Sequence, residues 1–208
     1  MIVRLTLVRH GDTVGESSIR YHGMNDVALS DVGCAQMAKV AQALGGERFD
    51  AVYCSELQRS RTGARIIAPA LEPRAVRGFN EIHFGRWEGL TREEIERADP
   101  ELYARWRVST GEFHYPEGDK VVDFRARVVS AWRELAAEAP ERALTVAHRG
   151  VSSAILMETL GVTSEELRSW RIGLGSIHVV ARDAGGWQPG GIDMHDHLDA
   201  PALLAGES

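Results

Sequence analysis

The stretch Thr6-Leu7-Val8-Arg9-His10-Gly11-Asp12-Thr13, near the start of the chain, is the one that decides the fold. The apolar run from Ile2 to Val8 contains β-branched residues and is typical of a buried parallel strand. It ends at Arg9 and His10, where Gly11 lets the backbone turn. In an open α/β sheet, ligands bind at the carboxyl ends of the strands. The sequence therefore predicts a cation and an imidazole at the edge of the sheet where a substrate binds.

The composition is that of an ordinary globular protein. Its 208 residues are 44% hydrophobic and 26% charged, which is enough to bury a core. We expect a single domain over residues 1–208 with a short insertion at about 79–120. The net charge of −6 argues against nucleic acid or an anionic membrane as the main partner. Cys34 and Cys54 form neither a metal-ligand nor a disulfide pattern, so we expect buried thiols.

Nothing in the sequence indicates export or membrane insertion. No apolar run approaches the roughly 18 residues of a membrane-spanning helix. The N-terminus also lacks the charged, apolar and cleavage regions of a signal peptide. We therefore expect a cytoplasmic protein.

Strand-like and helix-like segments alternate along the chain, which predicts a mostly parallel sheet covered by helices. Ser30 is expected to cap the first helix, and Ser55 with Gln58 the second. Residues 79–120 are expected to be irregular, with one or two short helices, and to pack over the edge of the sheet. The remaining strands are expected at about 49–54, 74–77 and 143–147, the helices at about 31–44, 55–68, 121–138 and 151–160, and a terminal hairpin at 176–181 and around Trp187, turning at Gly185-Gly186.

A second predicted strand, Ala143 to Ala147, is also followed by a histidine, His148. Arg59 and Arg61 lie in the first turns of the helix after the second strand, so cations reach the same edge of the sheet. Guanidinium groups and helix N-termini both bind phosphate oxygens, so this group of residues suits a phosphoryl dianion. Arginines on helices usually remain in solvent, which is the expectation for Arg61.

Five stretches, spread over almost the whole chain, form one ordered pattern: residues 7–13 (LVRHGDT), 20–30 (RYHGMNDVALS), 55–62 (SELQRSRT), 80–89 (NEIHFGRWEG) and 147–150 (AHRG). In this order they resemble the histidine phosphatase superfamily, in its branch of phosphoglycerate-mutase-like phosphatases. Each stretch alone is weakly diagnostic, whereas the five together are specific. The resemblance implies an α/β three-layer sandwich, with a mostly parallel central sheet covered by helices on both faces.

The resemblance also implies a phosphohistidine mechanism. A neutral His10 would attack phosphorus and form the covalent intermediate. Arg9, Arg59 and a protonated His148 would hold the equatorial oxygens as charge develops on them. Glu81 is the candidate proton donor to the leaving oxygen, provided that its surroundings keep it protonated near neutral pH. The scheme requires no metal and no cofactor.

Further contacts are expected around this centre. Thr13 and Gly150 are expected to contact the phosphate, and Gly23, His22 and Arg149 the rest of the substrate. Arg149 stands where the family usually has a small residue, and it either adds a cation at the rim of the pocket or points to solvent.

Glu16 stands where the family often has an asparagine that touches phosphate. A carboxylate there would repel phosphate, so either Glu16 turns away or Ser17 or Thr13 replaces the contact. The stretch His195-Asp196-His197 is weak evidence for a metal site, because no partner cluster accompanies it.

Three functions remain open from the sequence. The first is a phosphomonoesterase acting on a small phosphorylated metabolite. The second is a cofactor-dependent phosphoglycerate mutase, although the paired arginines that mutases place in a longer insertion have no clear match beyond Arg105 and Arg107. The third is a weakly catalytic regulatory or binding module. A homodimer is possible in each case.

Overall fold

The computed structural model describes residues 2–109, 111–138 and 140–198, and within them six strands form one sheet in the order β3-β2-β4-β1-β5-β6. The strands β3, β2, β4 and β1 run parallel to one another, and β5 and β6 are antiparallel. The predicted mostly parallel sheet is therefore confirmed. The strand bounds are β1 (Arg4–Arg9), β2 (Ala51–Cys54), β3 (Arg74–Ala75), β4 (Arg142–Ala147), β5 (Ile177–Asp183) and β6 (Gly186–Met194).

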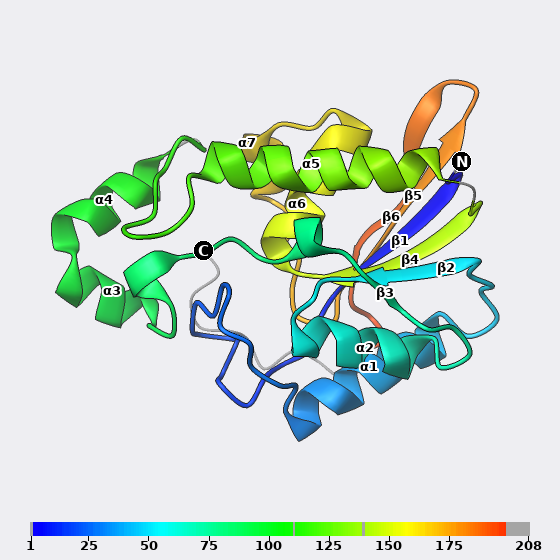
Figure 1. Ribbon diagram of the computed structural model, residues 1–208, viewed down its shortest axis with the longest axis horizontal. Helices are drawn as coiled ribbons and strands as arrows, with labels where there is room; N and C mark the ends of the chain where they lie inside the picture. The colour runs from blue at the N-terminus through cyan, green and yellow to red at the C-terminus, as the bar shows by residue number, and fades with distance from the viewer. Residues whose placement is uncertain (1, 110, 139, 199–208) are drawn as a thin grey trace.

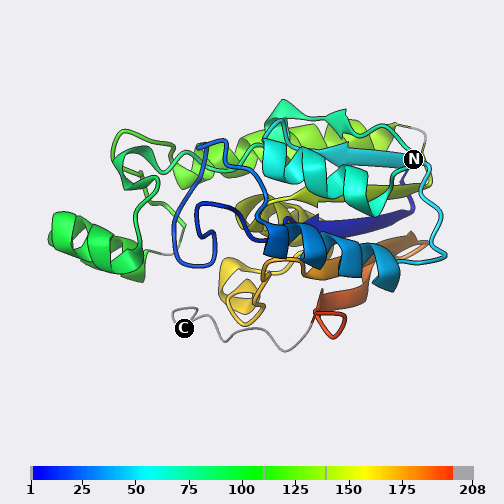
Figure 2. The ribbon, with the colours of Figure 1, turned by 90° about the horizontal axis from the view of Figure 1, so that it is seen from below.

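Helices cover both faces of the sheet, which makes the three layers that the resemblance implies (Figures 1 and 2). Successive side chains of a strand point to opposite faces. Leu5 and Leu7 of β1 accordingly pack in the core beneath α5 and α6, whereas Val8 packs with residues of α1 and α2. The helices of the two outer layers are α1 (Asp31–Ala43) and α2 (Gln58–Ile67) on one face, and α5 (Val121–Ala137), α6 (Arg149–Leu160) and the short α7 (Ser164–Leu167), which the sequence did not predict, on the other.

The two predicted helix caps have different outcomes. The Ser30 side chain accepts a hydrogen bond from the amide of Gly33, so the predicted cap of α1 is confirmed. The predicted Ser55 cap is wrong, because α2 begins at Gln58 and its N-cap residue, Leu57, makes no side-chain capping bond. Ser55 instead places its hydroxyl against His148, the residue that follows β4, as described below.

Between β3 and α5 the chain forms the short helices α3 (Arg92–Ala98) and α4 (Pro100–Val108). They lie beyond the N-terminal end of α5 and past the carboxyl ends of the parallel strands (Figure 1). A network of edge-to-face aromatic contacts joins this segment to the loop after β1, with Tyr21 against Phe84 and Trp106. The segment therefore covers the carboxyl end of the sheet, where His10 and His148 follow their strands.

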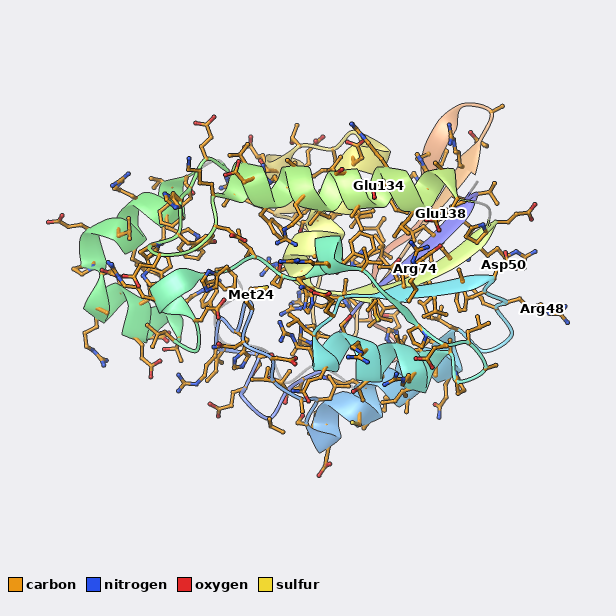
Figure 3. All side chains as sticks on the ribbon, viewed as in Figure 1. Met24, Arg48, Asp50, Arg74, Glu134 and Glu138 are labelled. Carbon is orange, nitrogen blue, oxygen red and sulfur yellow. The ribbon has the colours of Figure 1, made fainter. Side chains whose placement is uncertain are left out.

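The opposite end of the sheet is held by charged surface contacts (Figure 3). Arg74 of β3 donates from Nη1 to Oε2 of Glu138, 2.7 Å away, and the amide of Arg142 donates to Asp50. Exposed ion pairs of this kind contribute about 0–1 kcal/mol, so this pair adds little to the stability of the fold. The hairpin turns at Ala184 and Gly185, one residue before the expected position, because Gly186 already belongs to β6.

Of the two cysteines, Cys54 is buried and Cys34 is only partly buried, so the expectation of two buried thiols holds for Cys54 alone. No helix among the described residues is long and apolar enough to cross a membrane.

Candidate active site

Two histidines meet at the carboxyl end of the sheet because β1 and β4 are parallel neighbours. Arg9 lies opposite Ala147 in the register, so His10 and His148, the next residue of each strand, come side by side. Their ring centroids are 5.1 Å apart and both rings are buried. Gly11 allows a close approach to α1, because a Cβ at this position would lie 2.5 Å from the carbonyl oxygen of Gly33.

The hydrogen bonds of His10 define which nitrogen can react. Its Nδ1 lies 2.7 Å from the carbonyl oxygen of Gly11, which can only accept, so the network assigns the proton to Nδ1. Nε2 then carries the lone pair, and Nε of Arg59 donates to it at 3.3 Å. Burial, followed by the charges of Arg59 and Arg9, holds the pKa of His10 well below its usual value. These contacts favour a neutral imidazole whose unprotonated nitrogen is Nε2.

Arg59 is one of the largest fully buried side chains of the protein. Its Nη1 donates to the carbonyl oxygen of Asn25 and its Nη2 to that of Gly23, each at 2.7 Å. These two carbonyls orient the guanidinium while leaving its charge without a buried carboxylate bonded to it. Arg61, two residues further along the helix, is exposed, as expected.

Arg9 is oriented by a part of the chain that the sequence analysis did not single out. Its Nη1 donates to the carbonyl oxygen of Ile172 at 2.8 Å. The carboxylate of Asp193 in β6 accepts from the amides of Arg171 and Ile172, at 2.8 and 3.0 Å, and so fixes that carbonyl. Ile172 and Asp193 both have positive φ angles, and no local pattern in the sequence predicts this link.

His148 is held by Ser55, whose Oγ lies 2.8 Å from Nε2. Its Nδ1 is buried and has no hydrogen-bond partner among the described residues. Burial, and then the charges of Arg59, His10 and Arg9, lower the pKa of His148 well below its usual value. This corrects the expectation of a protonated His148: in this structure the ring is neutral and offers a single N–H.

Glu81 is also buried at this edge, 8% exposed. Its Oε2 accepts from the amide of Gly150 at 3.1 Å, and its Oε1 from the amide of Ile82 at 3.0 Å. A Cβ at Gly150 would lie 2.5 Å from Oε1 of Glu81, so only glycine allows this approach. The amide of Gly150, expected to contact phosphate, is thus directed at Glu81 here.

The segment that carries Glu81 is held by hydrogen bonds to Glu56 and Arg127, which the sequence analysis did not identify. Asn80 exchanges two hydrogen bonds with Glu56, one with its amide at 2.9 Å and one with its carboxylate at 2.8 Å. Arg127 of α5 donates from Nη1 to the carbonyl oxygens of Gly78 and Asn80. Both partners come from distant parts of the chain, which explains why no motif spacing indicated them.

These side chains line a cavity of about 360 Å³. Its walls include Arg9, His10, Arg59, Glu81 and His148, together with three predicted substrate residues, namely His22, Gly23 and Arg149. Arg149 therefore lies at the pocket, which resolves the alternative left open by the sequence. Among the described residues, no group of three His, Cys, Asp or Glu side chains is placed to hold a metal ion.

The loop after β1 settles the question of Glu16. Its side chain is exposed and pairs with Arg20, with Nε and Oε2 3.3 Å apart, so the carboxylate turns away from the cavity. Ser17 lines the cavity instead. Thr13 lies behind Ser17, and the two hydroxyl oxygens are 2.7 Å apart. Thr13 therefore positions Ser17 and does not itself line the cavity.

Known proteins share both the sequence pattern and the fold. Residues 5–192 match the model of the histidine phosphatase superfamily (branch 1). The chain is 31% identical over 176 residues to an adenosylcobalamin/alpha-ribazole phosphatase of Salmonella typhimurium, covering 82% of this chain and 86% of that protein. It is 32% identical over 169 residues to a metal-independent phosphoserine phosphatase of Arabidopsis thaliana, covering 78% and 71% of the two chains.

Solved structures agree. A putative alpha-ribazole-5'-P phosphatase from Escherichia coli superposes with a TM-score of 0.85 at 25% identity, covering 93% of this chain and 97% of that one. A mycobacterial glucosyl-3-phosphoglycerate phosphatase superposes with a TM-score of 0.82 at 25% identity, covering 93% and 99%. The chain therefore belongs to branch 1 of the histidine phosphatase superfamily and is a phosphoric monoester hydrolase.

Proposed function

We propose that the protein hydrolyses a small phosphorylated metabolite through a phosphohistidine on Nε2 of His10. The observation that carries the proposal is the setting of His10: it lines the cavity, its Nδ1 lies against the carbonyl oxygen of Gly11, and Nε of Arg59 lies 3.3 Å from Nε2. The relatives named above are phosphatases of small metabolites, which supports the same substrate class.

In the first step Nε2 of His10 attacks phosphorus, and the bond to the ester oxygen breaks. Negative charge on the equatorial oxygens is held by the guanidinium groups of Arg9 and Arg59, whose carbonyl partners keep them in place before substrate arrives. Such preorganised charge is the main source of catalysis in phosphoryl transfer. His148 adds one N–H donor from the buried Nδ1, with Ser55 on its other nitrogen.

Glu81 gives its proton to the leaving oxygen in this scheme. In the second step it takes a proton from water, the water oxygen attacks phosphorus, and the bond to Nε2 of His10 breaks to regenerate the neutral imidazole. Glu81 lines the same cavity as His10, which this role requires. The role also requires that its carboxyl group be protonated when substrate binds.

The proposal also covers cofactor use, location, domain organisation and oligomeric state. The groups proposed to bind phosphate are the side chains of Arg9, Arg59 and His148, so the scheme requires no metal ion or cofactor. A cytoplasmic location, a single domain over residues 1–208 and a homodimer stay predictions.

Phosphate release from p-nitrophenyl phosphate, measured beside the interconversion of 2- and 3-phosphoglycerate, tests the proposal. We expect rapid phosphate release with little interconversion. Rapid interconversion with little phosphate release would favour the mutase instead; of the two arginines considered for that activity, Arg105 is exposed and outside both large cavities, and only Arg107 lines one. Inactivity in both assays would favour a binding module.

A further inference from the structure

A second and larger cavity, of about 570 Å³, adjoins the first. It lies among α4, the N-terminal end of α5, α6 and α7, on the side of the sheet where Figure 1 shows these helices together. The two cavities share Tyr21, Glu81, Phe84, Arg92 and Arg149 in their walls. A molecule whose phosphate lies beside His10 can therefore extend past Glu81 into the second cavity.

The second cavity carries an excess of positive charge, although the whole chain has a net charge of −6. Among its described lining residues the single acidic side chain is Glu81, whereas the arginines are Arg92, Arg107, Arg125, Arg149 and Arg168. A cleft lined by one sign of charge attracts the opposite sign, because its low-dielectric walls concentrate the field. The charge of this cavity therefore suits an anionic ligand.

Several exposed arginines elsewhere on the protein are paired with a carboxylate. Arg74 pairs with Glu138 and Arg133 with Glu158, at 2.7 and 2.8 Å. By contrast, neither Arg125 nor Arg168 makes an ion pair with any residue of the described ranges. These cationic side chains at the cavity have no internal acidic partner, which leaves them available to a bound anion.

Aromatic side chains form the other wall of the cavity. Trp106 donates from its ring N–H to the hydroxyl of Tyr115 at 3.0 Å, and Tyr115 packs edge-to-face on Phe84. These contacts keep the rings rigid and use their polar atoms internally, so the surface that remains is flat and apolar. The wall suits the carbon skeleton of an organic group, and the arginines suit its charge.

We propose that this second cavity binds the leaving group of the substrate, and that this leaving group carries a second anionic group, either a carboxylate or a phosphate. The inference rests on the proposed function, because Glu81 protonates the leaving oxygen there and lines both cavities. Arg125 is the specificity residue that we single out: it is half-buried, and its guanidinium lies against the main chain of Gly111, where a Cβ would approach Nη1 to 2.8 Å.

Matched pairs of phosphoesters test the proposal. 3-Phosphoglycerate is compared with glycerol 3-phosphate, which lacks the carboxylate, and fructose 1,6-bisphosphate with fructose 6-phosphate, which lacks the second phosphate. We expect kcat/KM to be roughly tenfold higher for the charged member of at least one pair, because a hydrogen bond to a charged group contributes more than one to a neutral group. A preference in the first pair identifies a carboxylate, and one in the second a phosphate.

The preference should depend on Arg125. In Arg125→Gln we expect the ratio of kcat/KM within the preferred pair to fall to about twofold or less. The matched control is Arg133→Gln on the same helix, which lies outside both cavities and should keep the full ratio. An unchanged ratio in Arg125→Gln would contradict the role of this residue.

A binding measurement distinguishes the proposed anion site from the proposed catalytic function. Calorimetry with the His10→Ala variant should show the same roughly tenfold preference in Kd, since binding needs no turnover. Equal Kd and equal kcat/KM within both pairs would overturn the anion site, and hydrolysis of p-nitrophenyl phosphate would still support the phosphomonoesterase. A Kd preference without hydrolysis of any compound would support the anion site and contradict the catalytic proposal.

Discussion

Nε of Arg59 lies 3.3 Å from Nε2 of His10, and both side chains are buried. The guanidinium thus performs two tasks at one place. Its charge lowers the pKa of His10, which favours an unprotonated Nε2, and the guanidinium lines the same cavity as His10. The remaining two nitrogens are occupied by main-chain carbonyls, so the orientation is set before substrate binds.

Replacing this guanidinium should therefore impair catalysis strongly. We expect Arg59→Gln to lower kcat for p-nitrophenyl phosphate by about 10²–10³, as the loss of an oxyanion-stabilising donor does in other enzymes. Arg61→Gln is the matched control, since Arg61 is exposed on the same helix, and it should stay within about twofold of the wild type. Activity of Arg59→Gln within tenfold of the control would contradict the role of Arg59.

The pH dependence of activity should reflect the charges of Arg59 and Arg9 beside His10. Because burial and two arginines hold the pKa of His10 well below its usual value, protonation of the nucleophile should not limit kcat/KM near pH 6.5. We expect the acid limb of the profile assigned to His10 to lie well below that pH, and to move upward in Arg59→Gln. An acid limb that stays at the same pH in the variant would be inconsistent with charge coupling between the two residues.

Ser55 should influence catalysis through His148, although it does not line the cavity. Leu57 donates its amide to Ser55 Oγ, so the hydroxyl proton is free to point to Nε2 of His148 and favour the tautomer with the proton on Nδ1. We expect Ser55→Ala to lower kcat about tenfold with a smaller change in KM. The control is Ser130→Ala, at an exposed position of α5, which should have no effect. An equal loss of kcat in both variants, or none in either, would argue against this positioning role.

Stability should also depend on pH, through His178. This histidine is buried, its pKa is lowered to about 4, and its Nδ1 accepts from the amide of Asp193. In the unfolded chain it takes up a proton near pH 6.5, whereas the folded protein resists this down to about pH 4. The stability it contributes is therefore complete above pH 6.5 and falls by about 3 kcal/mol as the pH drops to 4.

Chemical denaturation at several pH values measures this effect. His178→Asn keeps an acceptor for the amide of Asp193 but cannot be protonated in this range, so the free energy of unfolding should fall less steeply below pH 6.5 than in the wild type. The His114→Asn variant, at an exposed histidine, serves as the control. Identical slopes in His178→Asn and the wild type would show that His178 does not titrate on unfolding.

Much of the architecture was predictable from the sequence because its signals are local. The alternation of apolar strands and amphipathic helices, with the Ser30 cap, predicted the parallel sheet and its covering helices. Two strands that each end in a histidine predicted that His10 and His148 would meet, and parallel neighbours with Arg9 opposite Ala147 do bring them together.

What the sequence did not predict depends on contacts between distant segments. The expectation of a protonated His148 was wrong, because the burial and the neighbouring charges of Arg59 and His10 that lower its pKa arise only when the chain folds. Ser55 was read as a helix cap because its spacing to Gln58 fits a capping box, while its actual partner lies 93 residues further along. The link from Asp193 through Ile172 to Arg9 has no local signal at all.

The covalent intermediate tests the central claim most directly. Wild-type enzyme is mixed with a phosphoester labelled on its phosphate, quenched in alkali during turnover, and the labelled peptide is sequenced by mass spectrometry. We predict acid-labile, base-stable phosphate on His10, absent from His10→Ala, which should also have lost turnover. Phosphate on another residue, or turnover by the wild type with no phosphate trapped on His10 at any quench time, would contradict the account.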